Sequence, residues 1–224
     1  VGKNMTCIEY GRNILIVDAG LMFPESAMPG VDYLLPDWDY LQDKKDWVRA
    51  VLLTHGHLDH VGALPHLMLE IEAPVYAPRL TRGLVEVRLR EEGMLDRVRL
   101  QSYAAGDRLS IGPFVVEPYH VCHSIPDSVG LGITPPAGLL VHTGDFKLDP
   151  TPVDGWPTDM AKLAEFGQRG VLALLSDSTN AERSGYTPSE AELSKTLSRV
   201  FATAQGRVIV ATFASNISRI QQVI

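Results

Sequence analysis

Three histidines and an aspartate stand close together in the segment His55-Gly56-His57-Leu58-Asp59-His60. His55 and His57 are two residues apart on a predicted turn, so their rings can point into one cavity, while Asp59 and His60 turn toward a neighbouring position. Imidazole and carboxylate ligands suit Zn²⁺ or Mn²⁺, and the segment lacks the cysteines of a closed structural zinc site. The alternative is a polar loop with incidental histidines. The dense spacing favours a metal site that does chemistry.

Two further residues follow apolar stretches typical of strands. His123 comes after the stretch 114–121, and Asp145 comes after the stretch 139–142. Either residue alone is more often structural, but a carboxylate between two cations can bridge them about 3.5–4 Å apart. Because they follow the histidine cluster in this order, they predict a centre with two metal ions.

Short apolar runs punctuated by glycine and proline predict the elements that position these residues. We expect strands at 14–17, 51–54, 114–121 and 139–142, a buried strand at 171–175, and helices at 61–71, 80–95 and 160–168. From about residue 176 the pattern becomes an alternation of helix and strand.

In this last part the sequence predicts a helix, a strand and a second helix. Thr187 is the expected N-cap of the first helix, with Glu190 closing a capping box and Gly206 ending the helix. The strand is expected at 207–213, and Ser215-Asn216 is expected to open the second helix.

Composition excludes several classes of protein. The 224 residues, 45% apolar and 21% charged, are typical of a globular chain that buries a core. No apolar stretch approaches the roughly 20 residues that cross a bilayer, and the two cysteines and the N-terminal segment indicate neither secretion nor a membrane, so we expect a cytoplasmic protein. The net charge of −7 argues against non-specific binding to nucleic acid but leaves room for a nuclease with a local metal centre.

The ordered motifs Asp18, 55–60, His123 and Asp145 resemble those of the metallo-β-lactamase superfamily. Further segments are similar to the ribonuclease J family of its β-CASP branch; they are 2–5, 18–24, 123–128, 143–147 and 176–182. The resemblance implies an α/β fold, an incomplete αββα sandwich over 1–178, followed at 179–224 by the start of an inserted β-CASP domain.

The resemblance also implies roles for individual residues. One metal would be held by His55, His57 and His123, and the other by Asp59 and His60, with Asp145 shared by both. Asp18 would lie behind the ligands, accept a hydrogen bond from a ligand histidine and fix its tautomer. Asp177 would be the acid of the first β-CASP motif, and with Asp59 and Asp145 it completes the expected catalytic carboxylates.

The implied activity is metal-dependent hydrolysis of RNA with two Zn²⁺ or Mn²⁺ ions, in RNA maturation and decay. The enzyme would act 5′-to-3′ from a 5′-monophosphate end and also cut internally, as a homodimer or homotetramer with RNA-decay partners. Hydroxide formed at the metals would attack phosphorus, with Asp59 orienting the water. Two alternatives stay open: a hydrolase of a small thioester or lactam, and a non-catalytic RNA-binding or scaffold module. The segment 176–224 favours a polymeric substrate.

Weaker candidates for RNA contacts are Lys147, Ser215 and Asn216, with Arg183. Single cations are more often solvated, and Ser215 and Asn216 are more often helix caps than phosphate ligands. Two later histidines of the family have no counterpart before Ile224 and no initiator methionine is present, so we expect an N-terminal fragment with a weakened second metal position and low activity.

Overall fold

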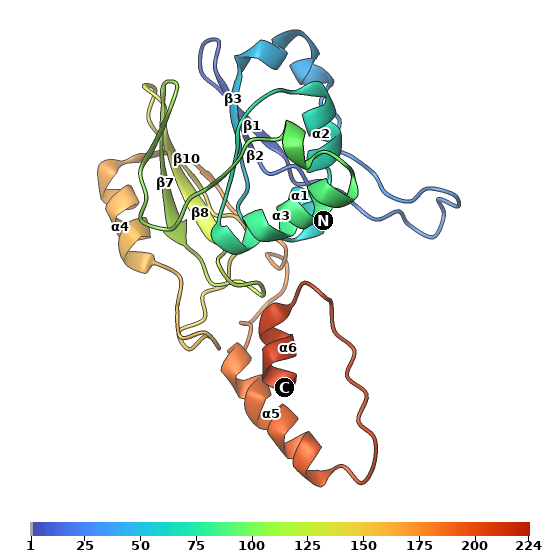
Figure 1. Ribbon diagram of the computed structural model, residues 1–224. Helices are drawn as coiled ribbons and strands as arrows, with labels where there is room; N and C mark the ends of the chain where they lie inside the picture. The colour runs from blue at the N-terminus through green and yellow to red at the C-terminus, as the bar shows by residue number, and fades with distance from the viewer. Residues whose placement is uncertain (1) are drawn as a thin grey trace.

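The computed structural model describes residues 2–224, which form two five-stranded sheets and the helices around them (Figure 1). The first sheet has the order β1-β2-β3-β4-β5 and the second β10-β9-β8-β7-β6. The first consists of β1 (Thr6–Glu9), β2 (Ile14–Val17), β3 (Val48–Leu52), β4 (Val75–Ala77) and β5 (Leu100–Ser102). The second consists of β6 (Leu109–Ile111), β7 (Phe114–His120), β8 (Val129–Thr134), β9 (Leu139–His142) and β10 (Val171–Leu175).

Helices cover the outer faces of both sheets. The α-helices are α1 (Leu58–Val61), α2 (Leu64–Glu70), α3 (Arg79–Glu91), α4 (Met160–Arg169), α5 (Glu190–Thr203) and α6 (Ile217–Val223), and the 3-10 helices are η1 (Asp39–Trp47) and η2 (Leu95–Arg97). None of the helices within residues 2–224 is long and apolar enough to cross a membrane.

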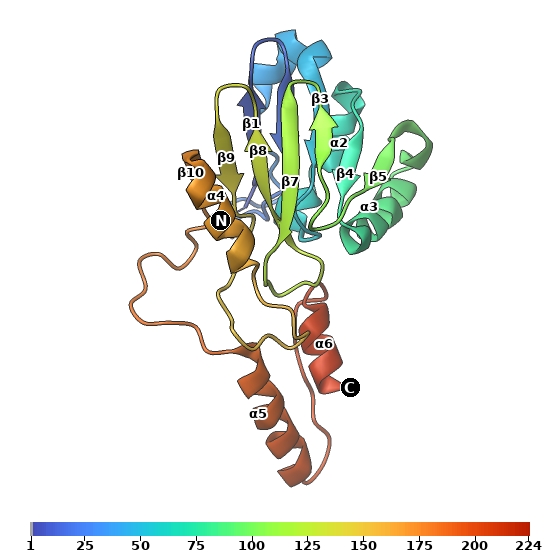
Figure 2. The same ribbon diagram turned by 90° about the vertical axis from the view of Figure 1, so that its left-hand side faces the viewer.

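Three apolar clusters show that these elements form four layers. One cluster joins the inner faces of the two sheets, with Leu15 and Leu52 packed near Phe114 and Leu131. A second lies between the first sheet and helices α1 to α3, and a third packs Phe166 of α4 against the second sheet. Figure 1 shows the layers from left to right as α4, the second sheet, the first sheet and helices α1 to α3, and Figure 2 looks onto the second sheet with α4 in front. The expected αββα arrangement is confirmed.

Most expected elements form close to their predicted bounds, but the helix expected at 61–71 is broken. The chain makes a turn at 62–63 between α1 and α2, and α1 already begins at Leu58. A Cβ atom at Gly62 would overlap the side chain of Leu21 and the carbonyl oxygen of Leu58, so only glycine fits this tight turn.

The strand β10 forms, but the expectation that it is buried is wrong. It pairs in parallel with β9 on one side and is the edge strand of its sheet, which leaves Leu172 and Leu174 64% and 63% exposed. The sequence predicts the strand correctly because a short continuous apolar run is typical of one. It cannot tell an edge strand from a central one.

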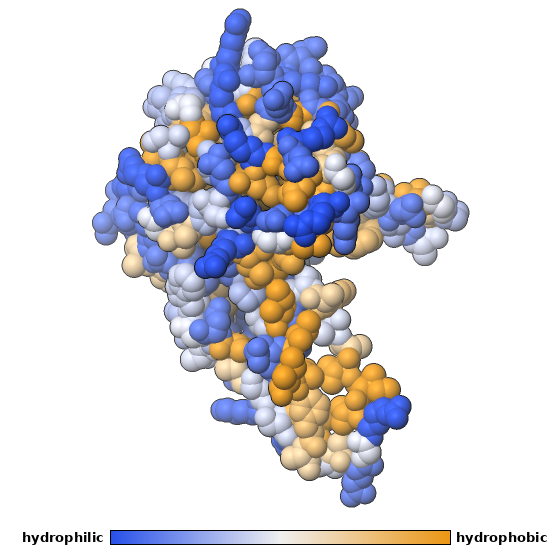
Figure 3. Space-filling view, viewed as in Figure 1, coloured by the Kyte–Doolittle hydropathy of each residue, from blue (hydrophilic) through white to orange (hydrophobic). Residues whose placement is uncertain are grey.

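The last part of the chain differs most from expectation. Residues 207–213 form no strand, since no neighbouring strand pairs with them, and Ile209 and Phe213 are each 85% exposed. Helices α5 and α6 pack on one another and extend away from the sheets, with apolar surface along this lower part of the molecule (Figures 1 and 3). The boundary at 178/179 stays a prediction.

The expected N-cap Thr187 is also wrong, and Gly206 does not end the first helix. α5 begins at Glu190 and ends at Thr203, and its N-cap is Ser189, whose hydroxyl accepts a hydrogen bond from the N–H of Ala191 at 3.2 Å. The N–H of Glu190 is satisfied from elsewhere in the chain, by the carboxylate of Asp149 at 3.0 Å. This long-range partner moves the helix start by two residues relative to the local pattern.

A buried carboxylate ties α4 to the second sheet. Glu117 of β7 is 6% exposed and accepts hydrogen bonds from Arg169 at 2.8 Å and Lys162 at 3.2 Å. Burial alone would raise the pKa of Glu117, but the hydrogen bonds from Arg169 and Lys162 outweigh it and lower the pKa below the ordinary 4.5. Glu117 therefore stabilises the fold in its charged form.

Replacing Glu117 with glutamine is expected to lower the free energy of unfolding by about 1–3 kcal/mol at pH 7. A carboxylate whose pKa is lowered on folding stabilises above its unfolded pKa, and this contribution is lost as pH falls through the folded pKa. The difference between Glu117→Gln and the wild type should therefore shrink in acid, as measured by urea unfolding. Glu165→Gln is the matched control, because Glu165 contacts the same two cations while 51% exposed; an equal loss in both variants would contradict the prediction.

Candidate metal centre

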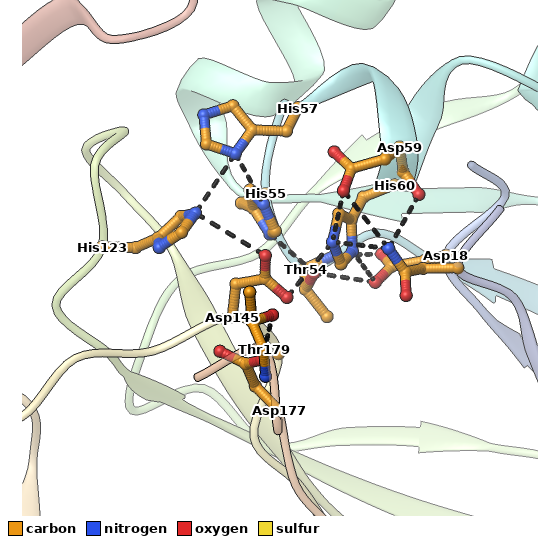
Figure 4. Close-up of polar contacts among 12 residues, drawn as sticks. Asp18, Thr54, His55, His57, Asp59, His60, His123, Asp145, Asp177 and Thr179 are labelled. Carbon is orange, nitrogen blue, oxygen red and sulfur yellow. Dashed lines mark hydrogen bonds and ion pairs between the residues drawn. The ribbon is translucent and has the colours of Figure 1, made fainter. Parts of the chain in front are cut away.

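The predicted ligands are brought together by strand ends. His55 is the third residue after β3, His123 the third after β7 and Asp145 the third after β9. Within the second sheet β7 and β9 are each antiparallel to β8 and so run in the same direction, which puts His123 and Asp145 at one edge. Figure 4 shows their side chains converging with those of the 55–60 cluster.

Three imidazoles form the first group, His55, His57 and His123. His57 Nδ1 lies 3.1 Å from His55 Nε2 and 3.1 Å from His123 Nε2. Burial lowers the pKa of all three, helped for His55 by the charges of neighbouring histidines, and brings the pKa of His123 to about 4. At neutral pH the three rings are therefore uncharged, the form in which imidazole binds a metal ion.

The three nitrogen atoms are placed as ligands of one cation would be, and hydrogen bonds among the rings do not explain their positions as well. One ring nitrogen carries either a proton or a lone pair in the ring plane, so His57 Nδ1 cannot hydrogen-bond well to two other nitrogens at once. Three nitrogens around a tetrahedral zinc at the usual Zn–N distance stand about 3.3 Å apart. The observed separations of 3.1 Å agree with this value. The residues present fit a divalent cation.

A second group consists of His55, His60 and Asp145. His60 Nε2 lies 3.2 Å from Asp145 Oδ1, and the other carboxylate oxygen, Oδ2, lies 3.8 Å from His123 Nε2. Burial alone would lower the pKa of His60, but Asp18 and Asp145 raise it to about 10. Burial would in turn raise the pKa of Asp145, which the hydrogen bond and charge of His60 lower. Asp145 thus faces both groups with one oxygen each.

Asp18 lies behind the second group and holds two ligand histidines in one tautomer. Its Oδ2 lies 2.7 Å from His60 Nδ1 and accepts a hydrogen bond from the Thr54 hydroxyl at 2.8 Å. The oxygen of that hydroxyl lies 3.0 Å from His55 Nδ1. With Nδ1 of each ring turned toward these oxygens, the Nε2 atoms of His55 and His60 are the ones that face the cavity and could bind a cation. The sequence analysis missed Thr54, although its place directly before His55 is a visible signal.

The backbone of Asp18 is as unusual as its contacts. Its φ of +62° lies in the left-handed region, which aspartate tolerates better than most residues, and the side chain is 1% exposed. Oδ1 accepts a hydrogen bond from the N–H of Thr54 at 2.7 Å, so both carboxylate oxygens of Asp18 have hydrogen-bond partners. Such a conformation persists where the surrounding structure determines it.

The remaining predicted carboxylates lie at the rim. Asp59 Oδ2 is 3.8 Å from His60 Nε2, close to the second group but outside its tightest set. Asp177 lines the same cavity as Asp145, and its Oδ1 accepts two hydrogen bonds from Thr179. Asn4, which the sequence places only in the segment 2–5 with no role of its own, has its amide nitrogen 3.1 Å from His60 Nε2.

Two hollows flank these residues. A cavity of about 790 Å³ is lined by His60, Asp145 and Asp177, together with the cations Lys3 and Arg183. A second, more apolar one of about 890 Å³ lies beside His57 and Asp59 and is lined by α3 and by residues 213–217. The candidate ligands therefore lie at the bottom of an open site rather than in a closed shell, as a catalytic metal requires.

Of the predicted RNA contacts, Lys147 and Asn216 have structural partners. Lys147 Nζ lies 3.4 Å from Glu190 and 3.9 Å from Asp149, and the Asn216 side chain accepts the N–H of Arg219 as the N-cap of α6. Ser215 lines the apolar hollow, and its carbonyl accepts the N–H of Ile217. Their contacts with RNA stay predictions.

Asp149 connects the segment after Asp145 to α5. Its carboxylate, 3% exposed, accepts the N–H of Glu190 at 3.0 Å and that of Thr151 at 2.9 Å. Asp149→Ala should destabilise the start of α5 by about 1 kcal/mol, the usual effect of losing an N-terminal acceptor, and hydrogen exchange of the α5 amides should accelerate. Asp154→Ala, in the same loop, removes only a local acceptor for Trp156 N–H; equal exchange in both variants would refute the role of Asp149.

Comparison with known proteins agrees with this geometry. Residues 1–175 match the metallo-beta-lactamase superfamily. The whole chain is 48% identical to "Ribonuclease J" of Thermus thermophilus and 45% identical to that of Helicobacter pylori J99, and the match covers 40% and 32% of those proteins. It is also 45% identical to "Ribonuclease J2" of Bacillus subtilis, again over 40% of that protein. The chain thus spans about a third to two fifths of these relatives.

Solved structures show the same fold at low sequence identity. A protein of unknown function from Enterococcus faecalis V583 superposes with a TM-score of 0.67 at 19% identity, over 99% of this chain and 60% of that one. The short form of human tRNase Z superposes with a TM-score of 0.50 at 15% identity, over 89% of this chain and 82% of that one. The sequence match over 1–175 and the two-sheet fold agree: the chain belongs to the metallo-beta-lactamase superfamily.

Proposed function

We propose that this chain carries the metal centre of a ribonuclease of the ribonuclease J type, which hydrolyses phosphodiester bonds of RNA with two divalent cations. The observation that carries the proposal is the position of Asp145, with one carboxylate oxygen toward His60 and the other toward His123. Two ligand groups that share a carboxylate suit in-line displacement at phosphorus. The names of the relatives supply RNA as the substrate class.

Each side chain has a definite task in this proposal. His55, His57 and His123 hold one cation, and His60 with Asp59 holds the other, while Asp145 contributes to both. When bound, the cations lower the pKa of water and neutralise charge on the phosphoryl oxygens. Asp59 Oδ2, at the rim, orients the attacking water and accepts its proton, and Asp18 keeps the ring nitrogens of His60 and, through Thr54, His55 in the binding tautomer.

We also propose that residues from 179 onward begin an inserted β-CASP domain that covers the RNA. The apolar side chains exposed on 207–213 and on β10 support this, since further strands of the complete gene product would bury them. Two zinc ions, or two manganese ions, are the proposed cofactors. Attack from a 5′-monophosphate end, with release of mononucleotides, is the proposed mode.

The test is cleavage of end-labelled RNA by the complete gene product. RNAs with 5′-monophosphate, 5′-triphosphate and 5′-hydroxyl ends are compared in Zn²⁺ and in Mn²⁺, with a β-lactam and a thioester as control substrates. We expect mononucleotide release that favours the monophosphate and disappears in His57→Ala. Turnover of a control substrate without RNA cleavage would instead establish a small-molecule hydrolase, and binding of RNA without either activity would establish a non-catalytic module.

A further inference from the structure

Asn4 lies in contact with the candidate metal centre, although it precedes the first strand. Its backbone N–H donates to the carbonyl of Asp59 at 3.0 Å, and its own carbonyl accepts the N–H of Gly20 at 2.9 Å. A Cβ atom at Gly20 would overlap the carbonyl oxygen of Asp59, so glycine allows the three segments to meet. Asn4 is thereby fixed between the end of β2 and the start of α1.

The side-chain amide of Asn4 faces three polar atoms. Its Nδ2 lies 3.1 Å from the carbonyl oxygen of Asp59, 3.4 Å from Asp59 Oδ2 and 3.1 Å from His60 Nε2. The two oxygens identify this atom as the nitrogen, because an amide oxygen here would face two acceptors. An NH₂ group has two protons, so it cannot donate to all three atoms.

Which two of these three atoms accept the N–H groups of Asn4 depends on what is bound at His60 Nε2. Asp18 holds the proton on Nδ1 of this ring, so Nε2 is the ring nitrogen that faces the cavity. A cation bound there would use the lone pair, and a proton bound there would point at Asp145 Oδ1, 3.2 Å away. In both cases Nε2 accepts nothing from Asn4, whose two N–H groups are left for the carbonyl and the carboxylate of Asp59.

We propose that Asn4 is a positioning residue that holds the Asp59 carboxylate toward the cation position of His60 and Asp145. Among residues 2–224, the amide of Asn4 is the one hydrogen-bond donor that the Asp59 carboxylate has. That carboxylate is 35% exposed, so without Asn4 it is free to rotate into solvent. The inference rests on the proposed pair of metal positions and assigns Asn4 to one of them.

Loss of the Asn4 amide is expected to weaken metal binding at only one of the two proposed positions. Hydrogen-bond partners behind a metal ligand typically change metal affinity by about 10–100-fold. Asn4 lies within hydrogen-bond distance of Asp59 and His60, whereas no hydrogen bond joins it to His57 or His123 in the described part of the chain. Loss of the amide should therefore weaken binding at the His60 position by that factor and leave the three-histidine position within about twofold.

The experiment measures metal affinity directly in the complete gene product. Wild type, Asn4→Ala and Asn4→Leu are titrated with Zn²⁺ against a chelator and with Co²⁺ by absorption spectroscopy; Asn4→Leu keeps the branched shape of the side chain and removes the donors. We expect one of two dissociation constants to rise about 10–100-fold in both variants. RNA cleavage should then need more metal for half-maximal rate but recover at saturating metal, whereas Asp59→Ala should not recover.

Two controls separate positioning from general structure. Asn13→Ala removes an asparagine that also bridges two segments, through Tyr10 and Arg49, far from the site, and it should change neither constant. In Asn4→Ala/Asp59→Ala the two effects should not add, because Asn4 acts through Asp59. Additive effects, equal weakening of both metal positions, or unchanged affinities would overturn the assignment of Asn4. A wild type that binds fewer than two metals would instead overturn the proposed metal pair.

Discussion

Asp145→Asn is expected to lower the rate of RNA cleavage by about 10³-fold or more, which corresponds to about 4 kcal/mol of lost transition-state stabilisation. The reason is the position of this carboxylate between the two ligand groups, with its oxygens 3.2 Å from His60 Nε2 and 3.8 Å from His123 Nε2. An amide supplies one neutral oxygen in place of two that share a negative charge. Cleavage of end-labelled RNA at saturating metal measures the effect.

The same variant should also bind less metal. Asp145 is the residue that faces both positions, so we expect both dissociation constants to rise, unlike the selective effect expected for Asn4. Asp43→Asn is the control, because Asp43 lies exposed on η1, away from the ligand groups. A normal cleavage rate in Asp145→Asn would exclude a shared carboxylate and with it the two-cation proposal.

Asp18→Asn is expected to have the second largest effect, on both stability and metal binding. The buried carboxylate accepts two hydrogen bonds from Thr54, and its Oδ2 lies 2.7 Å from His60 Nδ1, whose proton it accepts in a hydrogen bond. An amide group offers an NH₂ to one of these donors, which favours the other tautomer of His60, with its proton on Nε2 where the lone pair is needed. Removing one partner of a buried pair typically costs about 3–5 kcal/mol.

We therefore expect Asp18→Asn to lose about 3 kcal/mol of unfolding free energy and to bind metal up to about 100-fold more weakly. Urea unfolding without metal and chelator competition measure the two effects separately. Asp127→Asn is a close control, since Asp127 also has a left-handed backbone, with φ of +65°, and also accepts a backbone N–H, from Leu80. If the two variants bind metal equally well, Asp18 does not govern the tautomer.

The candidate ligands could be singled out from the sequence because chemistry and spacing are local properties. His55, His57 and His60 share one turn, and His123 and Asp145 each follow an apolar strand by three residues. The sequence could not show that Asn4 and Thr54 join them. Asn4 reaches Asp59 across 55 positions of chain, and a lone asparagine carries no periodic signal.

The errors have a common physical origin. Residues 207–213 and β10 are apolar, and apolar composition predicts extended, buried backbone, but a strand is stabilised only by a neighbouring strand. The helix start at Thr187 was inferred from local capping chemistry, whereas Asp149, 41 positions from Glu190, supplies the acceptor that sets it. Long-range partners decide both cases.

The sequence by itself indicated a metal site and predicted half of the strands that form, β2, β3, β7, β9 and β10, since residue type and hydrophobic patterning act within a few residues. The superfamily followed from the resemblance of the ordered motifs. Only the tertiary structure decided which candidate ligand atoms face one another, and that Nδ1 of His60 faces Asp18 while Nε2 faces the cavity. These depend on angles and distances of a few ångströms between segments far apart in the chain. Asp18, held at the end of β2 in a left-handed conformation, orients a histidine 42 positions away.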